Sequence, residues 1–398
     1  MSPSVRIRLS VLMLLQYFIW GAWYVTMGTY LMASLKADAV QVGAAYANLS
    51  IAAIISPFFV GLVADRFFSA QHVLAVLHLA GAAVLYRISM VPDFNSFWWL
   101  ILLYTLLYMP TMSLANAVSF RQMEEPGKEF PSVRVFGTVG WIAAGLLIGS
   151  LEVEATAMPF RIAAGSSLLL GLYSFLLPPA PPVRRQVKLA DILGLDALIL
   201  FKDRTYVVFF IAAICICIPL SFYYSLTNPF LNSTGMVNAA GKMTLGQVSE
   251  FAFLLLMPFL FSRLGVKKML LTGMCCWILR YVFFAFGDNH SLVWMLYGGI
   301  LLHGVCYDFF FVTGQIYTDH KAGQAVKSAA QGLITFATYG VGMLLGSYVS
   351  GFVALKYSVA TGNNIQYHWT NIWLMPAIIT MGVMILFIFL FRENKNKQ

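Results

Sequence analysis

The sequence predicts an all-α protein that crosses a membrane about twelve times, and three observations support this fold class. The chain has 398 residues, of which 60% are hydrophobic and only 10% are charged. The apolar residues fall in long runs, and a helix needs about 20 such residues to cross a hydrocarbon core of about 30 Å. Only helices and closed barrels satisfy their backbone polar groups in lipid, so these runs predict a helical bundle.

Twelve apolar runs have the length of a membrane span. They cover, approximately, residues 9–33, 41–64, 70–90, 96–120, 131–151, 158–178, 205–231, 243–263, 267–287, 291–318, 324–355 and 368–391. Between the sixth and seventh runs, prolines within 178–182 precede Arg184, Arg185 and Lys188, a stretch that cannot stay in lipid. We therefore expect an N-terminal six-helix bundle at 1–180, a cytoplasmic linker at 181–204 and a C-terminal six-helix bundle at 205–398.

The positive charges fit a membrane topology better than nucleic-acid binding. The net charge is +9, but the Lys and Arg residues alternate from loop to loop and form no single stripe. Most of them fall on one side of the membrane if both termini are cytoplasmic, as the positive-inside rule requires. The first run is too long for a signal-peptide core, so we expect it to remain as the first helix.

No cofactor or metal is expected. The five cysteines lie inside apolar runs, without the spaced Cys and His sets that zinc requires. The sequence also contains no glycine-rich phosphate loop of the P-loop pattern, which excludes this route to nucleotide-driven pumping. Active transport would then draw on a gradient.

Four ionisable residues interrupt the apolar runs: Arg134, Glu250, Arg280 and Asp308. A charge at the centre of a membrane helix costs about 2.5 to 3.5 kcal/mol, so such residues usually face a wet cavity or a partner. We interpret them as a transport pathway, except for Arg280, which is expected to be structural.

The fifth run carries Arg134, Thr138 and Trp141 at positions i, i+4 and i+7. This spacing places a cation, a hydroxyl and an indole on one helix face, which could bind a polar ring. Alternatively, Arg134 snorkels to the cytoplasm and Trp141 packs against lipid or a neighbouring helix.

The seventh run carries Ser221, Tyr224 and Asn228 at positions i, i+3 and i+7, which again predicts one polar face. Pro219 and Pro229 weaken the backbone ladder nearby and predict a flexible gate. A capping or packing role for Asn228 is the alternative.

The eighth run carries Gln247 and Glu250 one turn apart, so an amide lies beside a titratable carboxyl. Solvent access could switch proton binding at that carboxyl, and binding of a hydroxylated solute could depend on the proton. The alternative is a structural glutamate near the outer end of its helix, satisfied by water.

The tenth run places His303 and Tyr307 on one helix face, with Asp308 about 100° further round. His303 could relay protons near neutral pH, or it could be a neutral, hydrogen-bonded packing residue.

Residues 61–67 (GLVADRF), between the second and third runs, resemble the first part of the G-x-x-x-D-R loop of the major facilitator transporters. The resemblance implies that Asp65 and Arg66 take part in gating, as a clamp at the cytoplasmic ends of the helices. An ordinary charged loop is the alternative.

Five further segments resemble the bacterial nucleoside permeases, which are proton-coupled symporters of that superfamily. They are residues 15–23 (LQYFIWGAW), 134–141 (RVFGTVGW), 193–197 (LGLDA), 247–250 (QVSE) and 308–310 (DFF). The resemblance implies a major facilitator fold, substrate-site roles for Gln247 and Glu250, and proton coupling through Glu250. Three positions depart from the family, because Ser221 and Tyr224 replace paired amides and His303 replaces an aromatic residue.

We therefore expect a proton-coupled nucleoside symporter that works by alternating access. The expected substrate ligands are Arg134, Thr138, Trp141, Ser221, Tyr224, Asn228, Gln247, Glu250, His303 and Tyr307, and the expected proton-coupling residues are Glu250 and Asp308. A carrier of another hydroxylated solute, such as a sugar or cell-wall fragment, and a non-transporting membrane sensor are the alternatives. No enzyme is expected, since no nucleophile and base stand at catalytic spacing. The expected setting is the bacterial inner membrane, as a monomer.

Overall fold

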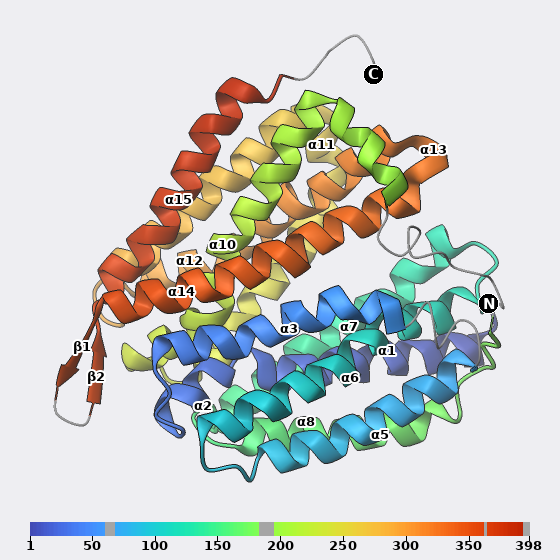
Figure 1. Ribbon diagram of the computed structural model, residues 1–398, viewed down its shortest axis with the longest axis horizontal. Coiled ribbons are helices and arrows are strands. Elements are labelled where there is room, and N and C mark those ends of the chain that lie inside the picture. Colours follow the sequence, from blue (N-terminus) through green and yellow to red (C-terminus); the bar gives the residue numbers. More distant parts are fainter. Residues whose placement is uncertain (60–67, 183–194, 362–363, 393–398) are drawn as a thin grey trace. The chain divides into compact units, whose positions relative to one another are not determined.

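A computed structural model describes residues 1–59, 68–182, 195–361 and 364–392. Within these ranges the chain is almost entirely helical, with one short β-hairpin (Figure 1). Contacts divide it into two units, one formed by residues 1–188 and 237–244, the other by residues 189–236 and 245–398. We describe each unit by itself.

The first unit is built from helices that follow the first six predicted spans. They are α1 (Pro3–Tyr24), α2 (Met27–Ala33), α3 (Ala39–Phe59), α5 (Ala70–Ile88), α6 (Phe94–Phe120), α7 (Pro126–Ser150) and α8 (Met158–Ser174). Helix α1 packs against α7 and α8, α5 lies between α6 and α8, and α3 packs on α6. Side-chain caps set two of the helix starts, with Ser2 accepting from the N–H of Val5 and Asp93 from that of Ser96.

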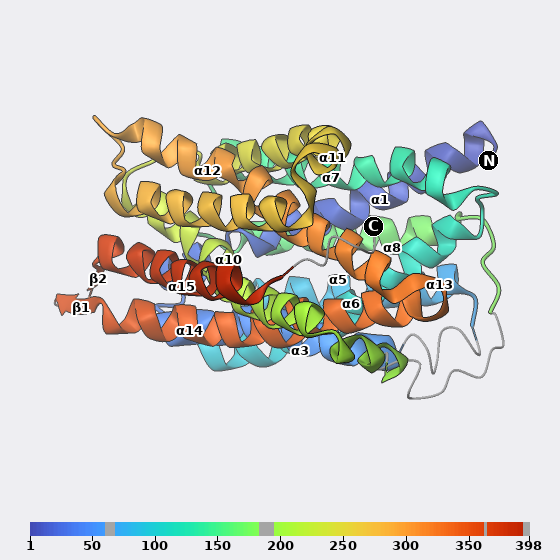
Figure 2. The same cartoon turned by 90° about the horizontal axis from the view of Figure 1, so that it is seen from above.

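The second unit contains more irregular elements. They are the 3₁₀ helix η2 (Leu195–Lys202), α10 (Arg204–Ser233), α11 (Ala239–Phe286), α12 (Val293–Tyr307), the π-helix η3 (Asp308–Val312), α13 (Thr313–Thr335), the π-helix η4 (Phe336–Gly342), α14 (Met343–Lys356), β1 (Ser358–Thr361), β2 (Asn364–Tyr367) and α15 (Trp369–Leu390). Helix α10 lies beside α14 and α15 in both views (Figures 1 and 2). The antiparallel hairpin, with Val359 opposite Gln366, joins α14 to α15 and was not predicted.

Two glycines break helices that each contain parts of two predicted spans. Helix α11 has 48 residues, about 72 Å at 1.5 Å per residue, which exceeds twice the roughly 30 Å hydrocarbon core. Gly265 interrupts it with φ 67°, in the left-handed region that glycine adopts without a side-chain penalty. Gly323, with φ 61°, breaks α13 in the same way. Both breaks fall between predicted spans.

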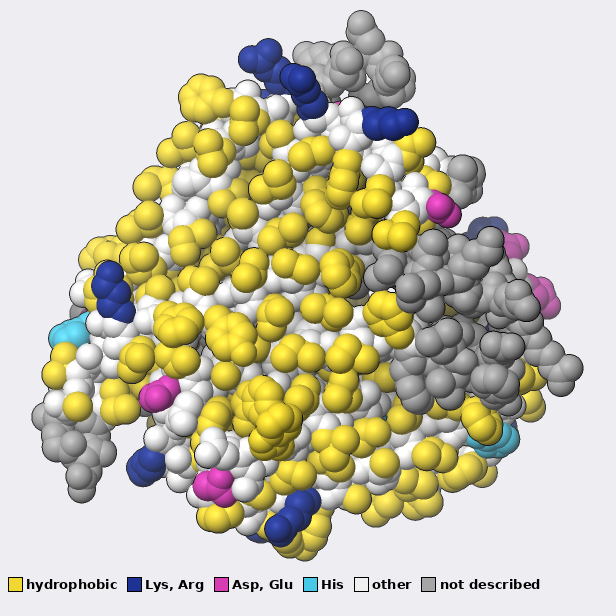
Figure 3. Space-filling view, viewed as in Figure 1, with side chains coloured by type: hydrophobic (Ala, Val, Ile, Leu, Met, Phe, Trp, Pro, Cys, Tyr) yellow, Lys and Arg dark blue, Asp and Glu magenta, His cyan; other side chains and the backbone are white. Residues whose placement is uncertain are grey.

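The described residues confirm the predicted all-α membrane fold. Ten helical segments are long and apolar enough to cross a membrane, and α11 supplies two of the predicted spans. Helix α8, with 17 residues, matches the sixth span but is shorter than the other spans. Figure 3 shows hydrophobic side chains over α14 and α15, as a lipid-facing surface requires. Exposed hydrophobic residues of these two helices include Leu345, Phe352, Leu386 and Phe389.

Two details differ from the sequence-based expectations, and a third expectation concerns residues that the structure does not describe. Residues 237–244, which begin the predicted eighth span, belong by their contacts to the first unit, where Glu154 accepts a hydrogen bond from the backbone of Ala240. Helix α10 runs without interruption through Pro219 and Pro229. Residues 183–194 of the predicted linker lie outside the described residues, so the bundle boundaries stay a proposal.

Candidate functional site

Helices α11 and α12 pack closely at the point where they carry Glu250 and His303. A Cβ atom added to Gly304 would clash with the backbone nitrogen of Glu250, and one added to Gly246 would lie 3.1 Å from Cβ of His303. Small residues allow membrane helices to approach this closely. The crossing therefore places Glu250 beside His303.

Glu250, His303 and Arg280 form a line of polar contacts. Glu250 Oε2 lies 3.8 Å from His303 Nε2, and His303 Nδ1 lies 3.1 Å from Arg280 Nη1. The side chain of Glu250 is 30% exposed, whereas His303 is 1% exposed and Arg280 has no exposed surface. The line thus connects a solvent-accessible carboxyl to a fully buried guanidinium.

Aromatic rings hold the Arg280 guanidinium in place. Its central carbon lies 3.5 Å from the ring centroid of Tyr223, 5.3 Å from that of Trp277 and 5.7 Å from that of Phe284. Contacts of a cation with ring faces at these distances are favourable. Nε and Nη2 have no hydrogen-bond partner of normal geometry among the described residues. Sequence reasoning missed the Arg280–His303 contact, although a charge in an apolar run was a signal for it.

Asp308 is a buried carboxyl at the start of the π-helix η3. It is 1% exposed, and neither of its carboxyl oxygens has a hydrogen-bond partner within the described part of the chain. Most buried polar atoms do have a partner, so such a group calls for an explanation. Single π-helical turns occur frequently at functional sites.

A second π-helix, η4, meets the residue just before Asp308. The hydroxyl groups of Tyr307 and Tyr339 are hydrogen-bonded to each other, and Tyr339 lies within η4. The Tyr307 ring also lies 5.9 Å from the ring of His303, measured between centroids. Tyr307 therefore links the Glu250–His303 pair to both π-helices.

The three predicted residues of α10 lie in different surroundings. Tyr224 is half-buried, and its ring stands edge-on to His303 with centroids 6.3 Å apart. Ser221 is buried, and its hydroxyl donates to the carbonyl oxygen of Cys217 at 3.0 Å. This hydroxyl is therefore already engaged in a hydrogen bond within α10. Asn228 has no exposed surface and accepts a hydrogen bond from the side chain of Asn232 at 3.3 Å.

The structure therefore gathers only part of the predicted second-unit set. Tyr224, Glu250, His303 and Tyr307 form one group, joined through His303. Gln247 stands three residues before Glu250 on α11 and is half-buried.

In the first unit, the predicted stripe on α7 packs against α1. The guanidinium carbon of Arg134 lies 4.0 Å from the ring centroid of Tyr17. The Trp141 ring meets that of Trp20 edge-on, with centroids 5.4 Å apart. Thr138 is half-buried between them along the helix. The arrangement fits the packing alternative for Trp141, whereas Arg134 makes a cation–π contact with Tyr17.

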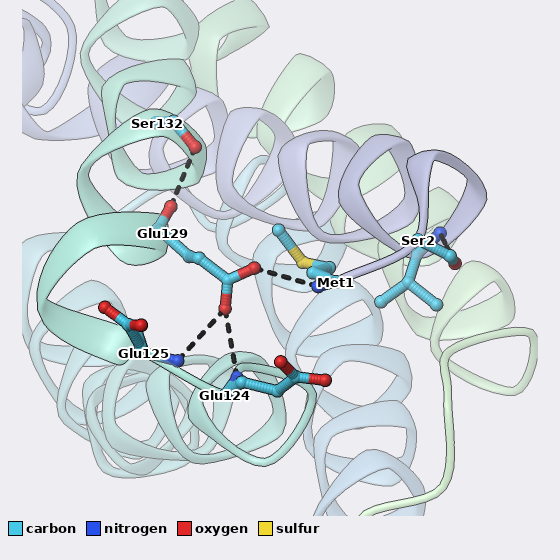
Figure 4. A network of polar contacts seen from close by, with 7 residues as sticks. Met1, Ser2, Glu124, Glu125, Glu129 and Ser132 are labelled. Atoms are coloured by element: carbon cyan, nitrogen blue, oxygen red, sulfur yellow. Dashed lines mark hydrogen bonds and ion pairs between the residues drawn. The ribbon is translucent and has the colours of Figure 1, made fainter.

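Glu129 fixes the start of α7, the helix that carries Arg134. Its Oε1 accepts a hydrogen bond from the Met1 amine at 2.9 Å, and its Oε2 accepts from the backbone nitrogens of Glu124 at 3.0 Å and Glu125 at 3.3 Å (Figure 4). The hydrogen bond to Glu129 raises the pKa of the Met1 amine above its ordinary value. A carboxylate in the first turn also complements the helix dipole.

Two further predictions concern gating and metals. Asp65 and Arg66 lie outside the described residues, so their expected gating role stays a prediction. Among the residues that are described, no group of three or more His, Cys, Asp or Glu side chains could hold a metal ion.

Comparison with known proteins assigns the family. The model of the nucleoside H⁺ symporter family matches residues 3–396. The chain belongs to the nucleoside H⁺ symporter family. It is 42% identical to the putative nucleoside transporter YegT of Escherichia coli over 98% of this chain and 94% of that protein. It is 32% identical to the Escherichia coli nucleoside permease NupG, over 98% and 96% of the two chains.

Solved structures agree with this assignment. The crystal structure of a mutant form of NupG matches with a TM-score of 0.91 and 31% identity, over 98% of this chain and 100% of that one. A bacterial homologue of the lysosomal transporter Spinster matches with a TM-score of 0.73 at 11% identity, which shows the fold alone. The major facilitator fold predicted from the sequence is confirmed.

Family membership also confirms the predicted function. This nucleoside H⁺ symporter is a multi-pass membrane transporter that couples nucleoside import to protons by alternating access, and it is not an enzyme. The non-transporting sensor is thereby set aside. The roles of individual residues are a separate question.

Proposed function

We propose that Glu250 and Asp308 carry the coupled proton and that the nucleoside binds beside Glu250. The observation that carries the proposal is the buried Asp308 carboxyl, whose oxygens have no hydrogen-bond partner in the described residues. Ionisable groups inside membrane spans are costly, and they mark substrate pathways and proton relays. Glu250 is the partly exposed carboxyl of the same unit and can reach both a solute and water.

The energy available from one proton is sufficient for concentrative import. A charge that moves down 100 mV supplies about 2.3 kcal/mol, which supports roughly 50-fold accumulation of a neutral solute. One proton per nucleoside therefore suffices, and it needs only one carboxyl to change its protonation state in each cycle.

The proposed nucleoside ligands in the second unit surround His303. Tyr224 and Tyr307 offer aromatic faces for a base or sugar, Glu250 accepts hydrogen bonds from hydroxyls, and Gln247 can donate and accept. Arg134, Thr138 and Trp141 remain proposed ligands contributed by the first unit. Ser221 and Asn228 are the weakest members of the proposed set, because both are buried and engaged within the bundle.

Uptake by purified protein in proteoliposomes tests this function. With an inward proton gradient, labelled uridine should accumulate, and collapsing the gradient with an uncoupler should return the internal concentration to that outside. Unlabelled nucleosides should compete, whereas sugars and nucleobases should not. Competition by sugars alone would contradict nucleosides as the substrate class.

Orientation, location and assembly complete the proposal. The distribution of Lys and Arg between loops supports cytoplasmic termini in a bacterial inner membrane. We propose that the protein works as a monomer of two six-helix bundles. Fusion of a reporter that is active only in the cytoplasm to the C-terminus tests the orientation, and mass measurement in detergent tests the monomer.

A further inference from the structure

Arg280 determines which nitrogen of His303 carries hydrogen. A guanidinium is permanently protonated and can only donate hydrogen bonds. Because Arg280 Nη1 lies 3.1 Å from His303 Nδ1, that nitrogen must act as the acceptor. Neutral His303 therefore carries its hydrogen on Nε2, the nitrogen that lies 3.8 Å from Glu250 Oε2.

Neither partner in this contact can readily rotate away. Arg280 has no exposed surface, and its guanidinium lies over the Tyr223 ring. The same Tyr223 ring stacks on the imidazole of His303, with centroids 4.7 Å apart and planes 21° apart. One side chain of α10 thus supports both the guanidinium of α11 and the imidazole of α12.

The contact also opposes a second proton on His303, whose ring is already almost completely buried. An imidazolium has hydrogens on both nitrogens, so its Nδ1–H would face an N–H of a permanent cation at hydrogen-bond distance. Other titratable groups in contact with the ring, among the described residues, include Tyr223 and Tyr224 of α10, Glu250 of α11 and Tyr307 of α12. None of these four removes the conflict at Nδ1.

We propose that Arg280 is a positioning residue that locks His303 as a neutral Nε2–H donor facing Glu250. His303 then supplies a constant hydrogen-bond donor and does not shuttle protons. The lock itself is independent of the transported solute, whereas its consequence for coupling, that the proton stays on the carboxyls, rests on the function proposed above.

Nitrogen NMR tests the lock directly. The full-length protein, with ¹⁵N-labelled histidines in lipid nanodiscs, is compared with a His303→Phe variant so that the His303 signals can be assigned among six histidines. Between about pH 5 and 8, where an ordinary histidine titrates, His303 should stay neutral with hydrogen on Nε2. Titration in this range, or hydrogen on Nδ1, would overturn the proposal.

A variant separates positioning from mere structural support. Arg280→Met removes the donor to Nδ1, so the ¹⁵N signals of neutral His303 should no longer be confined to the Nε2–H form and should show hydrogen on Nδ1 as well. Arg280→Lys, which keeps a cationic donor, should retain the Nε2–H form, and the double variant Arg280→Met/His303→Phe should lose these signals, which assigns them. An Arg280→Met spectrum with hydrogen still confined to Nε2 would contradict the proposal.

The uptake test of function and the NMR experiment fail in different ways. If the unaltered protein transports no nucleoside, the proposed function fails, and the NMR experiment still decides whether Arg280 fixes the tautomer. If uptake is proton-driven but His303 titrates, the proposed transport function is supported and the proposed role of Arg280 is wrong. Should Arg280→Met not fold, the measurement on the unaltered protein remains decisive, because it needs His303→Phe only for assignment.

Discussion

Each unit buries a histidine, and the two histidines have opposite surroundings. In the first unit, His78 Nε2 lies 2.9 Å from Gln16 Oε1 and its Nδ1 lies 3.1 Å from Ser167 Oγ. Gln16 Nε2 in turn donates to Thr111 Oγ1 at 2.7 Å. Every polar side-chain atom of this cluster, which we call the His78 network, has a neutral partner.

In the second unit, the group around His303 is incompletely satisfied. His303 Nε2, two guanidinium nitrogens of Arg280 and both carboxyl oxygens of Asp308 have no hydrogen-bond partner of normal geometry in the described residues. A buried polar group without a partner costs about 1–3 kcal/mol, and more if it is charged. We propose that the first network serves stability, whereas the second serves binding and proton transfer.

The largest effect should come from removing the buried acid. Asp308→Asn keeps the shape of the side chain but cannot release a proton. Proton-driven accumulation of uridine should fall from roughly 50-fold at 100 mV to equilibration, while exchange of labelled for unlabelled uridine continues. Uptake and counterflow in the same proteoliposomes measure both. Asp203→Asn, at a carboxyl outside the predicted spans, is the matched control and should accumulate uridine normally. Full accumulation by Asp308→Asn would contradict a role for this carboxyl in proton coupling.

Damage to the His78 network should lower stability and spare coupling. Gln16→Leu removes the acceptor for His78 and the donor to Thr111, leaving buried polar groups without partners. The free energy of unfolding should drop by about 1–3 kcal/mol, seen as a lower melting temperature of the purified protein. Gln366→Leu, on the exposed hairpin, is the control. A changed pH profile of uptake with an unchanged melting temperature would assign the network a functional role instead.

The Tyr307–Tyr339 pair resembles the His78 network although it belongs to the second unit, because both of its hydroxyls have a hydrogen-bond partner. Tyr339→Phe removes one hydroxyl of the pair and should cost about 0.5–1.5 kcal/mol, the usual value for one hydrogen bond. The melting temperature should fall slightly, and proton-driven uptake should persist. Loss of uptake at unchanged stability would show that the link between the two π-helices takes part in the transport cycle.

The smallest effect is expected at the Lys321–Asp203 ion pair, whose side chains are 36% and 38% exposed. Lys321→Ala should cost at most about 1 kcal/mol, as for other exposed pairs. Although partial burial raises the pKa of Asp203, the hydrogen bond from Lys321 holds it below its ordinary value. The pair's contribution is therefore present above the unfolded pKa of about 3.9 and lost as pH falls through the lower folded value. Melting curves at neutral and acidic pH test this, and a large effect at neutral pH would contradict it.

Much of the fold follows from the sequence because bilayer thickness fixes span length. Runs such as 205–231 and 368–391 correspond to α10 and α15 within a few residues. The sequence could not predict the hairpin after α14 or the packing of residues 237–244 with the first unit. The packing of residues 237–244 depends on contacts with distant segments, which local hydropathy does not record. The hairpin pairs neighbouring residues, 358–361 with 364–367, but hydropathy read for membrane spans does not report it. Helix α10 continues through Pro219 because packing against neighbouring helices can outweigh the loss of one backbone bond.

The site was predictable along each helix but not between helices. Helical spacing placed His303 and Tyr307 on one face, and their rings are indeed close. The contact of His303 with Arg280 joins residues 23 positions apart. It depends on how α11 and α12 cross, which the approach of Gly304 to the Glu250 backbone determines. Spacing alone also could not show that the Ser221 hydroxyl is used inside the bundle.

Proton movement at Glu250 tests the central claim most directly. A pH-sensitive dye inside proteoliposomes reports proton entry when uridine is added outside, without an imposed gradient. The unaltered protein should acidify the interior in step with uridine uptake, whereas Glu250→Gln should admit no protons while still exchanging uridine. Equal acidification by Glu250→Gln would contradict the assignment of the coupled proton to this carboxyl.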